Sequence, residues 1–204
     1  MQAIVDVDAS ARAGRAPMDI ARAFLDGGAS FIQLRAKRLP SAEFLALCDR
    51  VVDLARRFNA TVIVNDRVDL ARLCGAAGVH VGQEDLPPVD ARRLLGPAAV
   101  VGFSTHTRAQ VEAAGAQPVS YVAVGPIFST ATKDTGYEPV GLALVRDARA
   151  RLPATVPLVA IGGITLDTAR SVIEAGADQV AVIGDLLATD NPGERTAAYQ
   201  RALM

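Results

Sequence analysis

Two basic side chains follow a short apolar strand near the start of the chain. In the segment FIQLRAK, which covers residues 31–37, the polar residues Gln33, Arg35 and Lys37 alternate with apolar ones. Because successive side chains of a strand point to opposite faces, these three share one face. In a barrel the outer face must be apolar to meet helices, so this face points inward. Two cations there need an anion as partner.

Carboxylates follow the next two apolar runs. Asp66 comes directly after VIVN (62–65), and Glu84 and Asp85 come shortly after VHV (79–81). Two carboxylates beside cations suit Mg²⁺, which takes hard oxygen ligands and commonly keeps substrate phosphate oxygens as well. Aspartate at such a position is also a good N-cap of a helix, so the structural role stays open.

The fifth apolar run ends in Ser104, and His106 follows it. His106 is a candidate general acid or base, although a histidine just before a helix start is also an ordinary surface residue. The other histidine, His80, lies inside an apolar run and is expected to be a hydrogen-bonded residue of the barrel interior.

Later breaks in the chain offer donors for a second anion. The longest break, residues 125–141, carries the hydroxyls of Thr130 and Thr132 and the ammonium of Lys133. Long loops in compact barrels are usually functional. Glycines also follow the apolar runs at 158–161 and 179–183, at Gly163 and Gly184. In barrels, backbone N–H groups of the loops after the last two strands often bind phosphate. The sequence therefore predicts two anion-binding ends, one of them with a metal.

These residues lie at or just after the ends of the apolar runs of a repeated unit. In each unit a short apolar run is followed by an amphipathic helix. The eight expected strands are Ala3–Val7, Phe31–Arg35, Val62–Asn65, Val79–Val81, Val100–Ser104, Tyr121–Gly125, Leu158–Ile161 and Gln179–Ile183. The eight expected helices are Met18–Asp26, Ala42–Phe58, Val68–Cys74, Val89–Leu95, Thr107–Ala114, Leu142–Arg151, Leu166–Ala175 and Gly193–Leu203. Alternating strands and helices predict a parallel sheet. Eight units in 204 residues predict an α/β fold in which one (β/α)8 TIM barrel with short loops forms a single catalytic domain over 1–204. An open doubly wound sheet is the alternative, but the segment after the first strand lacks its glycine fingerprint.

Composition narrows the class of function. Half of the residues are apolar and the formal net charge is −1, which is typical of a globular protein and gives no reason to expect nucleic acid as a partner. No apolar run approaches the length of a membrane span, and the opening residues do not read as a signal peptide. Cys48 and Cys74 have no metal-ligand spacing and are expected to be buried thiols in a cytoplasmic protein.

Seven motifs in order resemble those of the thiamine-phosphate synthase family. They are IQLRAK (32–37), VNDRVDLA (64–71), GVHVGQEDL (78–86), GFSTH (102–106), GPIFSTATKD (125–134), AIGGIT (160–165) and GADQVAVIG (176–184). The resemblance implies that hydroxymethylpyrimidine diphosphate is attacked by the nitrogen of hydroxyethylthiazole phosphate. The products are thiamine phosphate and pyrophosphate, and the C–O bond of the diphosphate breaks first.

The resemblance also implies roles for particular residues. Asp66 and Asp85 would bind Mg²⁺, and the groups acting on the reacting diphosphate would be Arg35, Lys37, Ser104 and Lys133. The residues contacting the pyrimidine diphosphate would be Gln33, Leu34, Arg35, Ala36, Lys37, Asn65, Ser104 and Lys133. The residues holding the thiazole phosphate would be Thr130, Ala131, Thr132, Gly163, Ile183 and Gly184.

Two positions depart from the family pattern, and two other functions stay open. Ala36 stands where the family commonly has an acid, and Gly184 where serine is common, so a hydroxyl contact is lost there while the backbone N–H remains. A thiazole tautomerase of the same fold, with a histidine near His106, is one alternative. A non-catalytic phosphate-binding barrel is the other. The expected partners are small phosphorylated substrates, and the sequence leaves a homodimer open.

Overall fold

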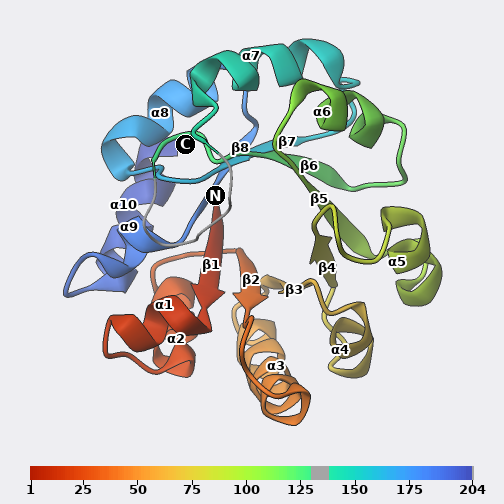
Figure 1. Ribbon diagram of the computed structural model, residues 1–204. Coiled ribbons are helices and arrows are strands. Elements are labelled where there is room, and N and C mark those ends of the chain that lie inside the picture. Colours follow the sequence, from red (N-terminus) through yellow and green to blue (C-terminus); the bar gives the residue numbers. More distant parts are fainter. Residues whose placement is uncertain (130–137, 204) are drawn as a thin grey trace.

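The computed structural model describes residues 1–129 and 138–203, and its strands form a closed parallel barrel. The order around the barrel follows the sequence from β1 to β8, so that β8 pairs with β1 (Figure 1). The strands are β1 (Gln2–Asp6), β2 (Phe31–Arg35), β3 (Thr61–Asn65), β4 (Gly78–Val81), β5 (Val100–Thr105), β6 (Tyr121–Val124), β7 (Leu158–Ile161) and β8 (Gln179–Val182). The predicted (β/α)8 architecture is thereby confirmed.

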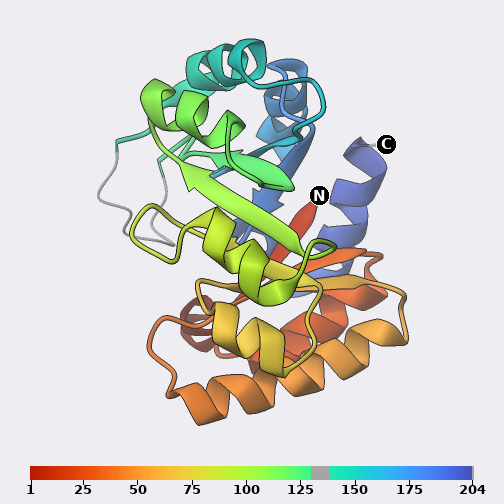
Figure 2. The same ribbon diagram turned by 90° about the vertical axis from the view of Figure 1, so that its right-hand side faces the viewer.

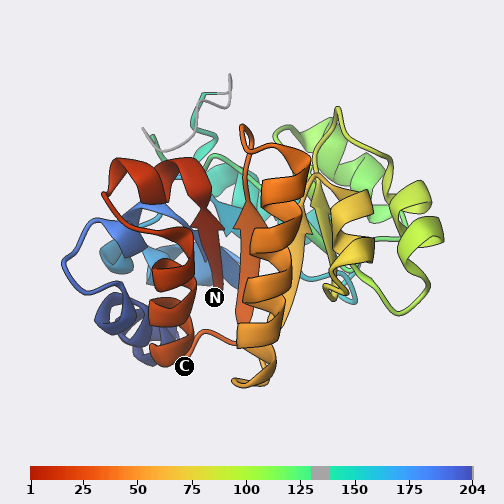
Figure 3. The same ribbon diagram turned by 90° about the horizontal axis from the view of Figure 1, so that it is seen from below.

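Helices cover the outside of the strands (Figures 1 and 2). They are α1 (Val7–Arg12), α2 (Pro17–Asp26), α3 (Ser41–Arg56), α4 (Val68–Leu73), α5 (Pro88–Leu95), α6 (Arg108–Gly115), α7 (Gly141–Arg151), α8 (Leu166–Glu174), α9 (Gly184–Leu187) and α10 (Pro192–Leu203). Figure 3 shows the arrowheads of β1 and β2 pointing to the same end of the barrel. Because all neighbouring strands are parallel, the loops that follow them gather at this C-terminal end.

Alternation along the strands divides the core into two layers. Ile32 and Leu34 of β2 lie in a large apolar cluster shared with the helices. Ile4 and Ile63 point to the inner face of their strands and lie in a smaller cluster inside the barrel. Each strand thus buries apolar side chains on its outer face and leaves its inner face free to carry polar residues toward the C-terminal end.

The first and last units differ from the prediction. The strand expected to run to Val7 ends at Asp6, whose carboxylate accepts a hydrogen bond from the Ala9 N–H at 2.7 Å and so begins α1. Neither α1 nor the short helix α9, directly after β8, is among the predicted helices. The four residues of α9 are too few to show a helical period. The capping box predicted at Thr107 and Gln110 is present at the start of α6.

Cys48 and Cys74 are both buried, as expected, and neither forms a disulfide. None of the helices in the described ranges has the length and apolarity that a membrane span requires.

Candidate functional site

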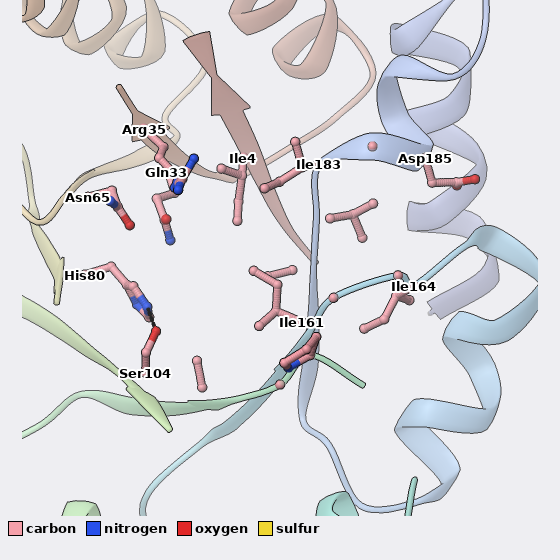
Figure 4. Close-up of a pocket in the computed structure, with 18 of the residues that line it drawn as sticks. Ile4, Gln33, Arg35, Asn65, His80, Ser104, Ile161, Ile164, Ile183 and Asp185 are labelled. Atoms are coloured by element: carbon pink, nitrogen blue, oxygen red, sulfur yellow. Dashed lines mark hydrogen bonds between the residues drawn. The ribbon is translucent and has the colours of Figure 1, made fainter. Parts of the chain in front are cut away.

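A cavity of about 330 Å³ opens at the C-terminal end of the barrel. Its lining comes from the ends of strands far apart in the sequence, including β1, β2, β3, β5, β7 and β8. In Figure 4, Gln33, Arg35 and Asn65 lie on one side, and Ile161, Ile164 and Ile183 lie on the other. The cavity therefore has a polar half and an apolar half, which suits a ligand or ligand pair of the same mixed character.

The polar half is built from side chains that the strand parity predicts. Gln33, Arg35 and Asn65 point into the barrel and are all more than nine-tenths buried. Buried polar groups need partners. The Nε atom of Arg35 has no hydrogen-bond partner among the described residues. The guanidinium thus keeps one N–H group that the described residues do not satisfy, on a side chain that lines the cavity.

Asp6 holds Arg35 in place, a pairing that the sequence prediction missed. The Asp6 carboxylate forms an ion pair with the Arg35 Nη1 group and also caps α1, and only 1% of Asp6 is exposed. The sequence carries a signal for this pairing, since Asp6 is two residues after the inward-facing Ile4 and therefore lies on the same face of β1. The ion pair fixes the direction in which Arg35 can present its remaining donors.

His80 connects the cavity wall to Ser104. Its Nε2 atom lies 2.8 Å from the Ser104 Oγ, and its Nδ1 atom lies 2.8 Å from the Tyr121 hydroxyl. The imidazole also stacks on the ring of Tyr121. Gly102, between them on β5, leaves the required space: a Cβ there would overlap the Tyr121 ring. The expectation that His80 is hydrogen-bonded inside the barrel is confirmed, and in addition the residue lines the cavity.

Lys37, Asp66 and Asp85 form a second cluster, on the loops after β2, β3 and β4. The Lys37 Nζ lies 2.5 Å from the Asp66 carboxylate, and Asp85 is close enough to influence the charge of Asp66. Asp85 accepts a hydrogen bond from the Gly82 N–H at 2.7 Å. Asp66 has a φ of 62°, a left-handed conformation that aspartate tolerates better than most residues. Asp66 and Asp85 are thus neighbours, although neither lines the cavity, and their role as metal ligands stays a prediction.

The electrostatics of this cluster fit a divalent cation. Burial raises the pKa of Asp66, and the neighbouring Asp85 raises it further, while Lys37 opposes both. Two adjoining carboxylates repel each other unless a proton or a cation lies between them. No group of three or more histidine, cysteine or acidic side chains is placed to hold a metal within residues 1–129 and 138–203. Two carboxylates completed by substrate oxygens form a typical Mg²⁺ site.

The apolar half contains the glycines predicted to approach a phosphate. Gly163, Ile183 and Gly184 all line the cavity. Gly163 has a φ of 64°, and a Cβ on it would overlap the Ser129 carbonyl oxygen. Only glycine fits this close crossing of the loops after β6 and β7, which brings the backbone of Gly163 to the cavity.

The remaining predicted residues fall into three groups. Leu34 is fully buried in the outer core and Ala36 packs against that core, so neither side chain lines the cavity. His106 lines the cavity, and its Nδ1 atom is 2.6 Å from the Gly125 carbonyl oxygen. Thr130, Ala131, Thr132 and Lys133 lie outside the described residues.

Comparisons with known proteins agree with this architecture. Residues 2–186 match the family model described as "Thiamine monophosphate synthase". A thiamine-phosphate synthase of Albidiferax ferrireducens is 44% identical over 179 residues, which are 88% of this chain and 81% of that protein. One of Gloeobacter violaceus is also 44% identical, over 86% of this chain, but the chain spans only about half (51%) of its length.

A solved structure adds the same result at the level of the fold. A thiamine phosphate pyrophosphorylase of Pyrococcus furiosus superposes with a TM-score of 0.88 at 29% sequence identity, covering 99% of this chain and 94% of that one. The family match spans nearly all of the chain and includes every strand of the barrel. The chain belongs to the thiamine monophosphate synthase family.

Proposed function

We propose that the chain joins hydroxymethylpyrimidine diphosphate to hydroxyethylthiazole phosphate, forming thiamine phosphate and releasing pyrophosphate. The observation that supports this most directly is the two-sided cavity. A buried arginine lines one side of the cavity and glycine-rich loops line the other, while two neighbouring aspartates lie outside the lining, on the loops after β3 and β4. Two phosphorylated substrates need two such ends.

The diphosphate is assigned to the polar half. Arg35 and Lys37 would contact its oxygens, and Asn65 and Gln33 would hold the pyrimidine beside Ser104. Asp66 and Asp85 would bind a Mg²⁺ ion, which when bound would stabilise negative charge on the diphosphate. The thiazole phosphate is assigned to the backbone around Gly163, Ile183 and Gly184.

The reaction in this arrangement needs no nucleophilic side chain. The C–O bond between the pyrimidine methylene group and the diphosphate breaks, and its electron pair leaves with the oxygen. The thiazole nitrogen then donates its lone pair to the methylene carbon. Arg35 and Lys37 stabilise the charge that develops on the leaving oxygen, and the apolar half holds the thiazole within reach while excluding water.

The direct test is to incubate the protein with both substrates and Mg²⁺ and to measure thiamine phosphate by chromatography. Product that appears only with both substrates supports the proposal, and its formation should stop in excess EDTA. Turnover that persists in EDTA would contradict the metal assignment. Absence of product, together with interconversion of thiazole tautomers, would instead support the tautomerase alternative.

A further inference from the structure

The carboxylate of Asp185 has an unusually complete set of partners. It lies in α9, and its Oδ2 atom accepts hydrogen bonds from the Tyr199 hydroxyl at 2.6 Å, from Arg195 Nε at 3.0 Å and from the Leu166 N–H at 3.2 Å. Its Oδ1 atom accepts a second bond from Arg195, at 2.9 Å. The side chain is only 11% exposed, so these contacts are made largely away from water.

These partners belong to two elements, and Asp185 belongs to a third. Leu166 is the first residue of α8 and follows the loop that contains Gly163, whereas Arg195 and Tyr199 lie on α10. Asp185 itself directly follows Gly184. One carboxylate therefore joins the loop after β7, the turn after β8 and the C-terminal helix.

The side chain does this without entering the cavity. Asp185 is among the lining residues, but Figure 4 shows its side chain directed away from Ile183 and toward the neighbouring helices. A carboxylate beside a phosphate would normally repel it. Here the bidentate pair with Arg195 neutralises the charge, and burial is outweighed by Arg195 and Tyr199, so the pKa of Asp185 lies below its usual value.

We propose that Asp185 is a positioning residue for the phosphate of the thiazole substrate. By tying Leu166 to α10, it fixes the spacing between the backbone N–H groups near Gly163 and those near Gly184. This inference rests on the assignment of the thiazole phosphate to these two loops, made above. It adds a residue that touches neither substrate but sets the geometry of the donors that do.

The chain offers a matched control at the opposite end of the barrel. Asp178, just before β8, accepts hydrogen bonds from the Leu158 N–H at 2.7 Å and from Arg149 at 3.0 Å. It thus joins the start of β7 to a helix through the same combination of backbone N–H and arginine. Its distance from the cavity separates general stabilisation from an effect on the site.

The test compares Asp185→Asn with Asp178→Asn by steady-state kinetics, varying each substrate while the other is saturating. For Asp185→Asn we expect the KM of the thiazole phosphate to rise about tenfold, which corresponds to about 1.4 kcal/mol. The KM of the pyrimidine diphosphate and kcat should stay within about twofold, because the other half of the cavity is untouched. Asp178→Asn should change neither KM.

A second variant guards against a failure of Asp185→Asn to fold. Tyr199→Phe removes one donor to the carboxylate and leaves all charges in place, so it should raise the same KM in the same direction but by less. Equal rises in both KM values, an unchanged thiazole KM, or the same shift in Asp178→Asn would each overturn the proposal.

A further variant distinguishes this inference from the assignment on which it rests. Gly184→Glu places a like charge where the thiazole phosphate is expected, and should raise its KM whatever Asp185 does. A response to Gly184→Glu without one to Asp185→Asn would overturn the role of Asp185 alone. An unchanged KM in Gly184→Glu would overturn the phosphate assignment and this inference together.

Discussion

At the scale of single residues, the proposed metal binding depends on two carboxylates, those of Asp66 and Asp85. Their carboxyls are near enough for Asp85 to raise the pKa of Asp66, and Lys37 neutralises only part of their combined charge. A cation between them and the substrate would remove the repulsion. The two residues should therefore be needed for catalysis and dispensable for folding.

The first prediction concerns this pair. Asp66→Ala should lower kcat by about a hundredfold or more, because the remaining carboxylate cannot by itself place the metal and diphosphate. The measurement is initial rate against Mg²⁺ concentration. The control is Asp69→Ala, a nearby exposed aspartate paired with Arg67, which should keep the rate of the unmodified chain. Equal rates in the two variants would remove Asp66 from the metal site.

A second prediction separates the synthase from the tautomerase. The Nδ1 atom of His106 faces the Gly125 carbonyl oxygen, and no step of the proposed reaction requires a proton from this residue. His106→Ala should lower the synthase rate by less than about tenfold, well short of the loss expected for a general acid or base. A loss of a thousandfold, measured under the same saturating conditions, would favour proton-transfer chemistry.

At the scale of elements, the loops after β6 and β7 depend on one close crossing. Gly163→Ala adds a Cβ that would overlap the Ser129 carbonyl oxygen, at a backbone conformation with positive φ. We expect a loss of about 2–4 kcal/mol in the free energy of unfolding, from overpacking and from the left-handed conformation together. Denaturant titration measures it.

Gly14 is the matched control for that substitution. Its φ of 68° is nearly the same, but no heavy atom lies within 4 Å of its would-be Cβ. Gly14→Ala should cost only about 1 kcal/mol, the contribution of the left-handed conformation. A similar loss in both variants would show that the crossing at Ser129 adds nothing.

At the scale of the whole molecule, the Asp185 network predicts a pH dependence of stability. Burial raises the pKa of this carboxyl, but Arg195 and Tyr199 outweigh it, so the native pKa is lowered. The stabilisation is therefore fully present above the unfolded pKa of about 3.9 and is lost as the pH falls through the native value. Asp185→Asn should cost about 2 kcal/mol at pH 7, the usual size for hydrogen bonds to a charged group.

Denaturant titrations at several pH values would test this dependence. The difference between Asp185→Asn and the unmodified chain should shrink as the pH falls below about 4. A difference that stays constant down to pH 3 would mean that the loss at pH 7 comes from packing rather than from charge.

The sequence by itself determined the repeating unit and which side chains of a strand face the cavity. Period-two alternation placed Gln33 and Arg35 inside the barrel and Ile32 and Leu34 outside, because strand geometry admits no other arrangement. The capping box at Thr107 was equally local. Parallel strands bring their carboxyl ends together, so the sequence alone indicates that residues far apart in the chain meet at one end of the barrel.

Only the tertiary structure decided how those residues are held. The pairing of Asp6 with Arg35 and the joining of three elements by Asp185 connect positions 29 and 10–19 residues apart. No periodicity records such contacts, since the first depends on the register of β1 against β2 and the second on how α8 and α10 pack beside α9. A pattern in the chain specifies which face of its element a side chain occupies. Which residue that side chain contacts depends on the element that tertiary packing places against that face.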